Sequence, residues 1–169
     1  MNFWRWFFIG LNHNSGISKF LDEWLIVQII ISISLTELVT EPIEKIATTF
    51  LLPLAGIFTG LAFALSSNTQ SLLESKEIER LSKEHKDGIE NYLYTYQVGI
   101  LTIFITLIGW GLASLKIFEK EFFSELYLSI KFLLFLFAVI SLRECWNILN
   151  YNHSMLHTKI IIRKLENDS

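Results

Sequence analysis

The sequence predicts an all-α integral membrane protein with four transmembrane helices, and three observations carry this prediction. Hydrophobic residues make up 51% of the 169 residues, and the mean hydropathy is +0.42. Charged residues come in bursts separated by long uncharged stretches, whereas soluble domains interleave charged and apolar residues. Two uncharged stretches, 46–73 and 91–115, exceed the roughly 20 residues with which a helix crosses a hydrocarbon core.

The composition and motifs argue against several other classes. The net charge is −3, and no cluster of Lys and Arg would form a nucleic-acid groove, so no direct nucleic-acid binding is expected. The one cysteine, Cys145, cannot form an internal disulfide, and we expect an inert buried thiol. No Ser/His/Asp motif, phosphate loop or carboxylate pair stands out. We therefore expect no enzyme activity and no cofactor.

The first predicted span covers residues 17–39. Its uncharged centre runs from Trp24 to Thr36, about 20 Å of helix, so Glu23 and Glu37 must reach the headgroups at its two ends. If this segment instead lay on the membrane surface, the chain would have three spans and its termini would lie on opposite sides.

The second span, 46–68, contains Pro53 and a small-residue face formed by Gly56, Gly60 and Ala64. Proline removes a backbone donor, so we expect a bend there. Small residues let two helix backbones approach closely. The face could serve packing within one chain or packing between protomers of a homo-oligomer.

The third span, 92–115, carries Gly109, which we also assign to helix packing. The fourth span, 126–148, contains Lys131 and Arg143. Both charges are tolerable if their long side chains reach opposite interfaces. Lys131 is then expected at the outer interface and Arg143 at the inner one.

The distribution of Lys and Arg predicts that both termini are cytoplasmic. With the N-terminus inside, the inner segments hold ten of these residues: Arg5, Lys19, Lys76, Arg80, Lys83, Lys86, Arg143, Lys159, Arg163 and Lys164. The outer segments hold four: Lys45, Lys116, Lys120 and Lys131. Cytoplasmic loops carry the positive excess, so a multi-pass protein of the bacterial inner membrane would have this orientation.

The inner loop, 69–91, is the long one, and its pattern predicts a cytoplasmic helical hairpin with its tip near residues 82–88. Four basic residues on it are the candidate contacts for a soluble cytoplasmic partner: Lys76, Arg80, Lys83 and Lys86. The tail, 149–169, is expected to be cytoplasmic as well. It has three open interpretations: a basic amphipathic end on anionic lipid, a helix end, or a docking strand for a partner.

Polar residues inside the spans are the remaining candidates. A pore formed by an oligomer could be lined by Gln28, Ser32, Thr102 and Thr106, although such groups more often bond to neighbouring helices. His153 and His157 are spaced as a metal pair, but no third ligand is near them. No metal site is therefore predicted.

The stretch Ala55-Gly56-Ile57-Phe58-Thr59-Gly60-Leu61-Ala62-Phe63-Ala64-Leu65-Ser66-Ser67, followed by the charged inner loop, resembles small four-span inner-membrane proteins of bacterial anti-phage systems. These are the membrane subunits of Kiwa systems (KwaA) and the RexB-like phage-exclusion proteins. The resemblance implies an oligomeric assembly that either senses membrane perturbation and holds a soluble partner, or depolarises the membrane itself. It covers the architecture and assigns no residue.

Overall fold

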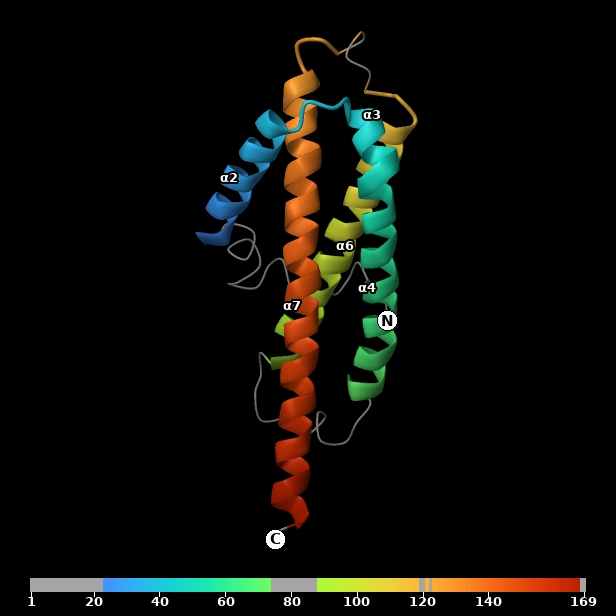
Figure 1. Cartoon of the computed structure of the whole chain (residues 1–169). Coiled ribbons are helices and arrows are strands. Elements are labelled where there is room, and N and C mark those ends of the chain that lie inside the picture. The colour runs from blue at the N-terminus through green and yellow to red at the C-terminus, as the bar shows by residue number, and fades with distance from the viewer. Residues whose placement is uncertain (1–22, 74–87, 119–120, 122, 168–169) are drawn as a thin grey trace.

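The computed structural model describes residues 23–73, 88–118, 121 and 123–167, and all regular structure in these ranges is helical. The elements are α2 (Glu23–Leu38), α3 (Ile43–Ile46), the π turn η1 (Ala47–Leu51), α4 (Leu52–Leu73), α6 (Gly88–Ser114) and α7 (Tyr127–Asn167). The all-α prediction is therefore confirmed for the described residues (Figure 1).

Three of these helical segments are long and apolar enough to cross a membrane, which indicates a membrane-embedded protein. They are Ile43–Leu61, Tyr96–Ser114 and Tyr127–Ile162. They match the predicted spans 46–68, 92–115 and 126–148. The fourth predicted span, 17–39, corresponds to α2 over its described part. At 16 residues, α2 is about 24 Å long, shorter than a hydrocarbon core of about 30 Å.

The second span begins directly after Pro42, which is the N-cap of α3. The chain then runs as one helix through α3, η1 and α4. Within it the N–H of Leu52 donates to the carbonyl of Ala47, five residues back. Such a π turn relaxes the helix next to Pro53, whose nitrogen has no proton to donate.

Helix α7 is the centre of the bundle, since α2, α4 and α6 all pack against it. In Figure 1, α7 is the longest element and extends past the end of α4. The connections α2–α3 and α6–α7 share one end of the bundle, called the connection end below. Of the three interpretations of the tail, the structure has the helix end, because α7 continues as helix through residues 149–167.

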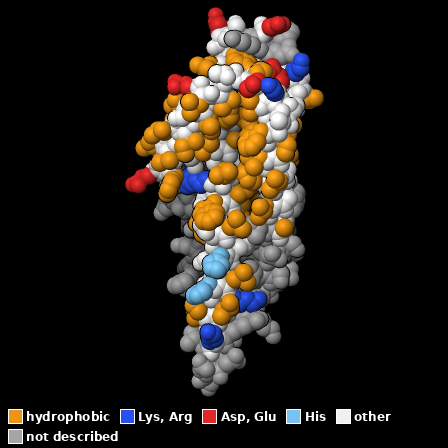
Figure 2. Space-filling view, viewed as in Figure 1, with side chains coloured by type: hydrophobic (Ala, Val, Ile, Leu, Met, Phe, Trp, Pro, Cys, Tyr) orange, Lys and Arg blue, Asp and Glu red, His pale blue; other side chains and the backbone are white. Residues whose placement is uncertain are grey.

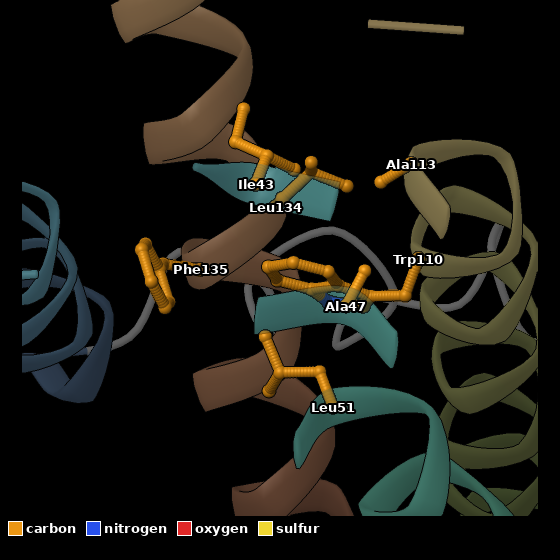
Figure 3. Packing of buried hydrophobic residues seen from close by; sticks show 7 residues of the cluster. All are labelled: Ile43, Ala47, Leu51, Trp110, Ala113, Leu134 and Phe135. Atoms are coloured by element: carbon orange, nitrogen blue, oxygen red, sulfur yellow. The ribbon is translucent and has the colours of Figure 1, made fainter. Parts of the chain in front are cut away.

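The best-packed apolar cluster lies near the connection end, where the α3–η1 segment, α6 and α7 meet (Figure 3). Its members are Ile43, Ala47, Leu51, Trp110, Ala113, Leu134 and Phe135. The Trp110 indole is 1% exposed and meets the Phe135 ring edge-on, with ring centroids 5.7 Å apart. The Tyr127 hydroxyl accepts a 3.0 Å hydrogen bond from the Ile43 N–H. These contacts fix the relative position of the three helices that can cross a membrane.

The outer surface of the bundle is largely apolar between its ends. Figure 2 shows hydrophobic side chains over the middle of the visible face, most of the acidic side chains and some basic ones at the connection end, and histidine and further basic side chains toward the other end. Large apolar side chains are exposed on every long helix. In water such a surface would drive aggregation, whereas in lipid it is the expected exterior.

Candidate functional site

Helix α2 is polar on its buried side and apolar on its exposed side. Gln28, Ser32 and Thr36 follow one another at intervals of four residues and are 4%, 0% and 7% exposed. Residues four apart share a helix face, and α2 packs against α7, so this stripe faces α7. The outer face carries Trp24 and Ile30, exposed by 62% and 58%. We call the contact of these two helices the α2–α7 seam.

The hydroxyl groups of the seam are satisfied within α2. Ser32 Oγ donates to the Gln28 carbonyl at 2.7 Å, and Thr36 Oγ1 donates to the Ser32 carbonyl at 2.7 Å. The Gln28 amide differs, because neither its oxygen nor its nitrogen has a hydrogen-bond partner among the described residues. A buried polar group without a partner is unfavourable. The Gln28 amide is therefore the unsatisfied polar group of the seam among the described residues.

Lys131 closes the other end of this seam. Its side chain is buried at 6% exposure, and Nζ donates to the carbonyl of Val39, one residue past the end of α2. The last carbonyls of a helix have no partner in the helix and carry partial negative charge. An ammonium group there holds the end of α2 against α7. We expected Lys131 to reach the outer interface; its amino group lies near the connection end, next to Val39, and its depth in the membrane stays a prediction.

A second polar contact joins α6 to α7. Thr106 Oγ1 lies 2.6 Å from Ser141 Oγ and 3.1 Å from the carbonyl of Phe137. It also lies 2.8 Å from the Thr102 carbonyl of its own helix, while Thr102 Oγ1 donates to the Val98 carbonyl at 2.9 Å. Thr102, Thr106 and Ser141 are all buried. The sequence analysis did not single out Ser141, although it is the polar exception in the apolar block 132–142.

The four pore candidates thus lie on inner faces of this bundle, in two places. Gln28 and Ser32 belong to the α2–α7 seam, and Thr102 and Thr106 belong to the contact of α6 with α7. The hydroxyls of all three Ser and Thr candidates have acceptors within the chain. These contacts are those of helix packing, and the two pairs do not form a single lining.

The glycines divide into two groups. A Cβ on Gly99 would lie 2.8 Å from Ile148 Cδ1, and one on Gly109 would lie 3.2 Å from Leu134 Cδ2, so these two let α6 approach α7 closely. A Cβ on Gly56 or Gly60 would meet nothing within 4 Å. Both are exposed, as is Ala64. The small-residue face of α4 therefore points away from the other described residues.

Helix α7 also carries a buried carboxyl residue, Glu144, that the sequence analysis did not single out. Glu144 is 9% exposed, next to Cys145 at 8%. Asn147 Nδ2 donates to Glu144 Oε1 at 3.5 Å. The signal was available, because an acidic residue within a predicted span is a candidate functional group by default. The Cys145 thiol is buried, which confirms that part of the prediction.

No protein-family model, curated protein or solved structure matches the chain. What the protein does must therefore follow from its own residues and their arrangement.

No group of three or more His, Cys, Asp and Glu side chains that could hold a metal occurs among the described residues. His153 and His157 are both exposed on α7. The four candidate partner contacts, Lys76, Arg80, Lys83 and Lys86, lie outside the described residues, as does the hairpin tip. The flanking helices α4 and α6 extend to Leu73 and from Gly88.

Proposed function

We propose that this protein is a non-enzymatic, homo-oligomeric component of the bacterial inner membrane that holds a soluble partner on the cytoplasmic side. The observation that carries the proposal is the length of α7. With 41 residues, α7 is about 60 Å long, twice the thickness of a hydrocarbon core. One half is sufficient to cross the membrane, and the other half is a rigid projection from it.

A four-span arrangement is supported by the polarity of α2. A helix that exposes Ile and Trp and buries Gln, Ser and Thr is built for an apolar surrounding. Its length falls about 6 Å short of a hydrocarbon core. Residues 17–22, outside the described part, are the predicted continuation of this span. Four spans then return both termini to one side.

The charge at the two ends of the bundle supports a cytoplasmic location for the projecting half of α7. Its far end carries Lys159, Arg163 and Lys164. The sequence on or beside the connection-end loops is acidic on balance, with six carboxyl residues against three lysines: Glu37, Glu41, Glu44, Glu119, Glu121 and Glu125 against Lys45, Lys116 and Lys120. Positive residues mark the cytoplasmic side of membrane helices. The same side carries the basic inner loop with Lys76, Arg80, Lys83 and Lys86.

Self-association is supported by the free small-residue face of α4. Close helix packing inside the chain uses Gly99 and Gly109, while Gly56 and Gly60 have open space beside them. Packing between protomers is thus the better of the two earlier interpretations. The resemblance to membrane subunits of anti-phage systems suggests phage defence as the setting, with membrane perturbation as the signal.

The experiment is purification in mild detergent with the proteins of neighbouring genes co-expressed, followed by the mass and composition of the complex. We expect a homo-oligomer with a soluble protein bound. The substitutions Lys83→Glu and Lys86→Glu should release that protein without changing the oligomer. Lys45→Glu, on the opposite end of the bundle, is the matched control and should leave binding intact. If the soluble protein still copurifies with the Lys83→Glu and Lys86→Glu variants, the assignment of the partner surface to this loop is refuted.

An ion-conducting effector that depolarises the membrane is the second candidate, and the buried Gln28 amide favours it. A polar group without a partner among the described residues is suited to contact water in a path between α2 and α7. Reconstituted protein should then conduct, and Gln28→Leu should change the current. Bilayers that stay silent with the oligomer present would remove this candidate.

A further inference from the structure

Exposed apolar side chains recur along one face of α7 and continue past the membrane-crossing half. Leu142, Trp146, Leu149, Leu156 and Ile160 are exposed by 55%, 63%, 37%, 48% and 53%. His153, also exposed, occupies the one position missing from the series. We call residues 142, 146, 149, 153, 156 and 160 the α7 stripe. Figure 2 shows hydrophobic side chains around the two histidines on the visible face.

The spacing of the α7 stripe is that of a helix paired with another helix. Successive members are separated by four, three, four, three and four residues. This alternation averages 3.5 residues and repeats positions a and d of a heptad. Side chains at such positions stay on one seam along two supercoiled helices. The stripe continues through two and a half heptads without an interruption by charge.

Neither lipid nor the bundle covers the far part of the stripe. A hydrocarbon core of about 30 Å uses about 20 residues, so a crossing that starts at Tyr127 ends near Asn147. Leu156 and Ile160 then lie about 14 Å and 20 Å farther along the helix. The headgroup layer adds only about 6 Å on each side. These apolar side chains are therefore predicted to lie in water unless another surface covers them.

We infer that α7 pairs along this stripe with α7 of a second copy, parallel and in register. The inference rests on the membrane-embedded oligomer proposed above and names its cytoplasmic interface. A membrane gives every copy the same orientation, so two identical helices present the same stripe at the same height. Symmetric contact of one patch with itself is the commonest way to form a dimer.

Two features of the stripe favour a second copy over a different protein. The pattern begins at Leu142 and Trp146 within the membrane-crossing half and continues to Ile160 in the projection, so one straight pair buries both parts. Tethering in a membrane also raises the effective concentration of the copies, which a short coiled coil needs. Lys159 and Lys164 flank the last turn with like charge, so added salt should strengthen the pairing.

The test is disulfide crosslinking in native membranes. In a Cys145→Ala background, Leu149→Cys and Leu156→Cys place a thiol on the stripe. Ser154→Cys and Ile161→Cys are the matched controls, because both positions are exposed but lie beside the stripe. After mild oxidation, we expect dimer at least fivefold more abundant for the two stripe positions than for the two controls.

Three other outcomes would overturn the inference. Equal crosslinking at all four positions would mean random collision, and a crosslink to a protein of different mass would assign the stripe to another partner. In the third outcome, the protein still purifies as an oligomer although the stripe cysteines form no crosslink. That result would refute this interface and leave the proposed oligomer unaffected. A second measurement avoids dependence on the thiols: Leu156→Glu should lower the oligomer mass, whereas Ser154→Glu should not.

Discussion

The contact between Thr106 and Ser141 gives the sharpest test of whether the polar groups near α7 hold the bundle together. We consider Thr106→Val, which keeps the shape of the side chain, and Ser141→Ala. Each removes one hydroxyl from a buried pair whose oxygens are 2.6 Å apart. Thr106 also loses its 3.1 Å contact with the carbonyl of Phe137. The two substitutions therefore disconnect α6 from α7 at one point without leaving a large cavity.

The expected magnitude follows from the number of hydrogen bonds between the helices. Thr106 donates its one hydroxyl proton to a single acceptor at a time, and the Ser141 hydroxyl can donate to Thr106 Oγ1, so the contact amounts to one or two interhelical hydrogen bonds. Such bonds contribute about 0.6 kcal/mol on average in membrane proteins and at most about 1.7 kcal/mol. We expect each single variant to lose an amount within this range. The double variant should lose less than the sum, with a coupling energy of about 0.6 kcal/mol.

The assay is unfolding of the purified protein in mixed micelles of mild detergent and dodecyl sulfate, followed by helix content. Thr59→Val is the matched control, because Thr59 Oγ1 donates at 2.7 Å to the Ala55 carbonyl of its own helix. That substitution should change the free energy of unfolding less than Thr106→Val does. Fully additive effects of the Thr106 and Ser141 substitutions would refute the argument that this contact joins the helices.

Three further predictions address other parts of the bundle. Lys131→Met should destabilise the packing of α2 by about 1–3 kcal/mol, because the Val39 carbonyl loses a charged donor. The rate of protease cleavage between α2 and α3 measures this loss. The control Lys131→Arg should keep most of the resistance to cleavage. Gly56→Ile should reduce the oligomer mass in mild detergent and leave monomer stability unchanged, whereas Gly99→Ile should lower monomer stability by about 1–3 kcal/mol through overpacking against α7. Trp110→Phe should change the free energy of unfolding far less than Trp110→Ala, about 3–5 kcal/mol, since the indole N–H has no acceptor among the described residues.

The class of the fold and the positions of the long helices were predictable from the sequence because both depend on the length of uncharged stretches. The stretches 46–73 and 91–115 exceed the span of a hydrocarbon core, and the structure has helices over both. Boundaries were also accessible where a residue sets them chemically. Pro42 lacks a donor for a preceding helix and is the N-cap of α3.

The inner and outer faces of the helices were harder to predict because hydropathy averages over both. Threonines such as Thr102 and Thr106 are found both in pore linings and in contacts between packed helices. The contact of Thr106 with Ser141 on α7 identifies the packing role here. The burial of Lys131 depends on where α2 ends, which involves a contact 92 residues away in sequence. Long-range contacts of this kind leave no local pattern.

The extent of α7 illustrates a different limit of sequence patterns. Hydropathy falls after Ile148, so we expected a transmembrane span followed by a separate tail. A helix can, however, continue from the membrane into water without a break. Residues 149–167 contain no proline or glycine, and nothing in their backbone chemistry stops a helix already formed upstream. Continuation therefore follows from the lack of a stop signal.

The rigid continuity of α7 links the two halves of the proposed function. In its membrane half, α7 holds α2 through Lys131 and α6 through Ser141. In its projecting half, the same helix carries the exposed stripe. A change in the tilt or spacing of the membrane helices must move the projection, because no break occurs between Tyr127 and Asn167. A helix that extends about 20 Å beyond the membrane turns a tilt of about 10° into a lateral displacement of about 3.5 Å at its end. Membrane perturbation could therefore open or close the α7 pair mechanically, without a ligand or a chemical step.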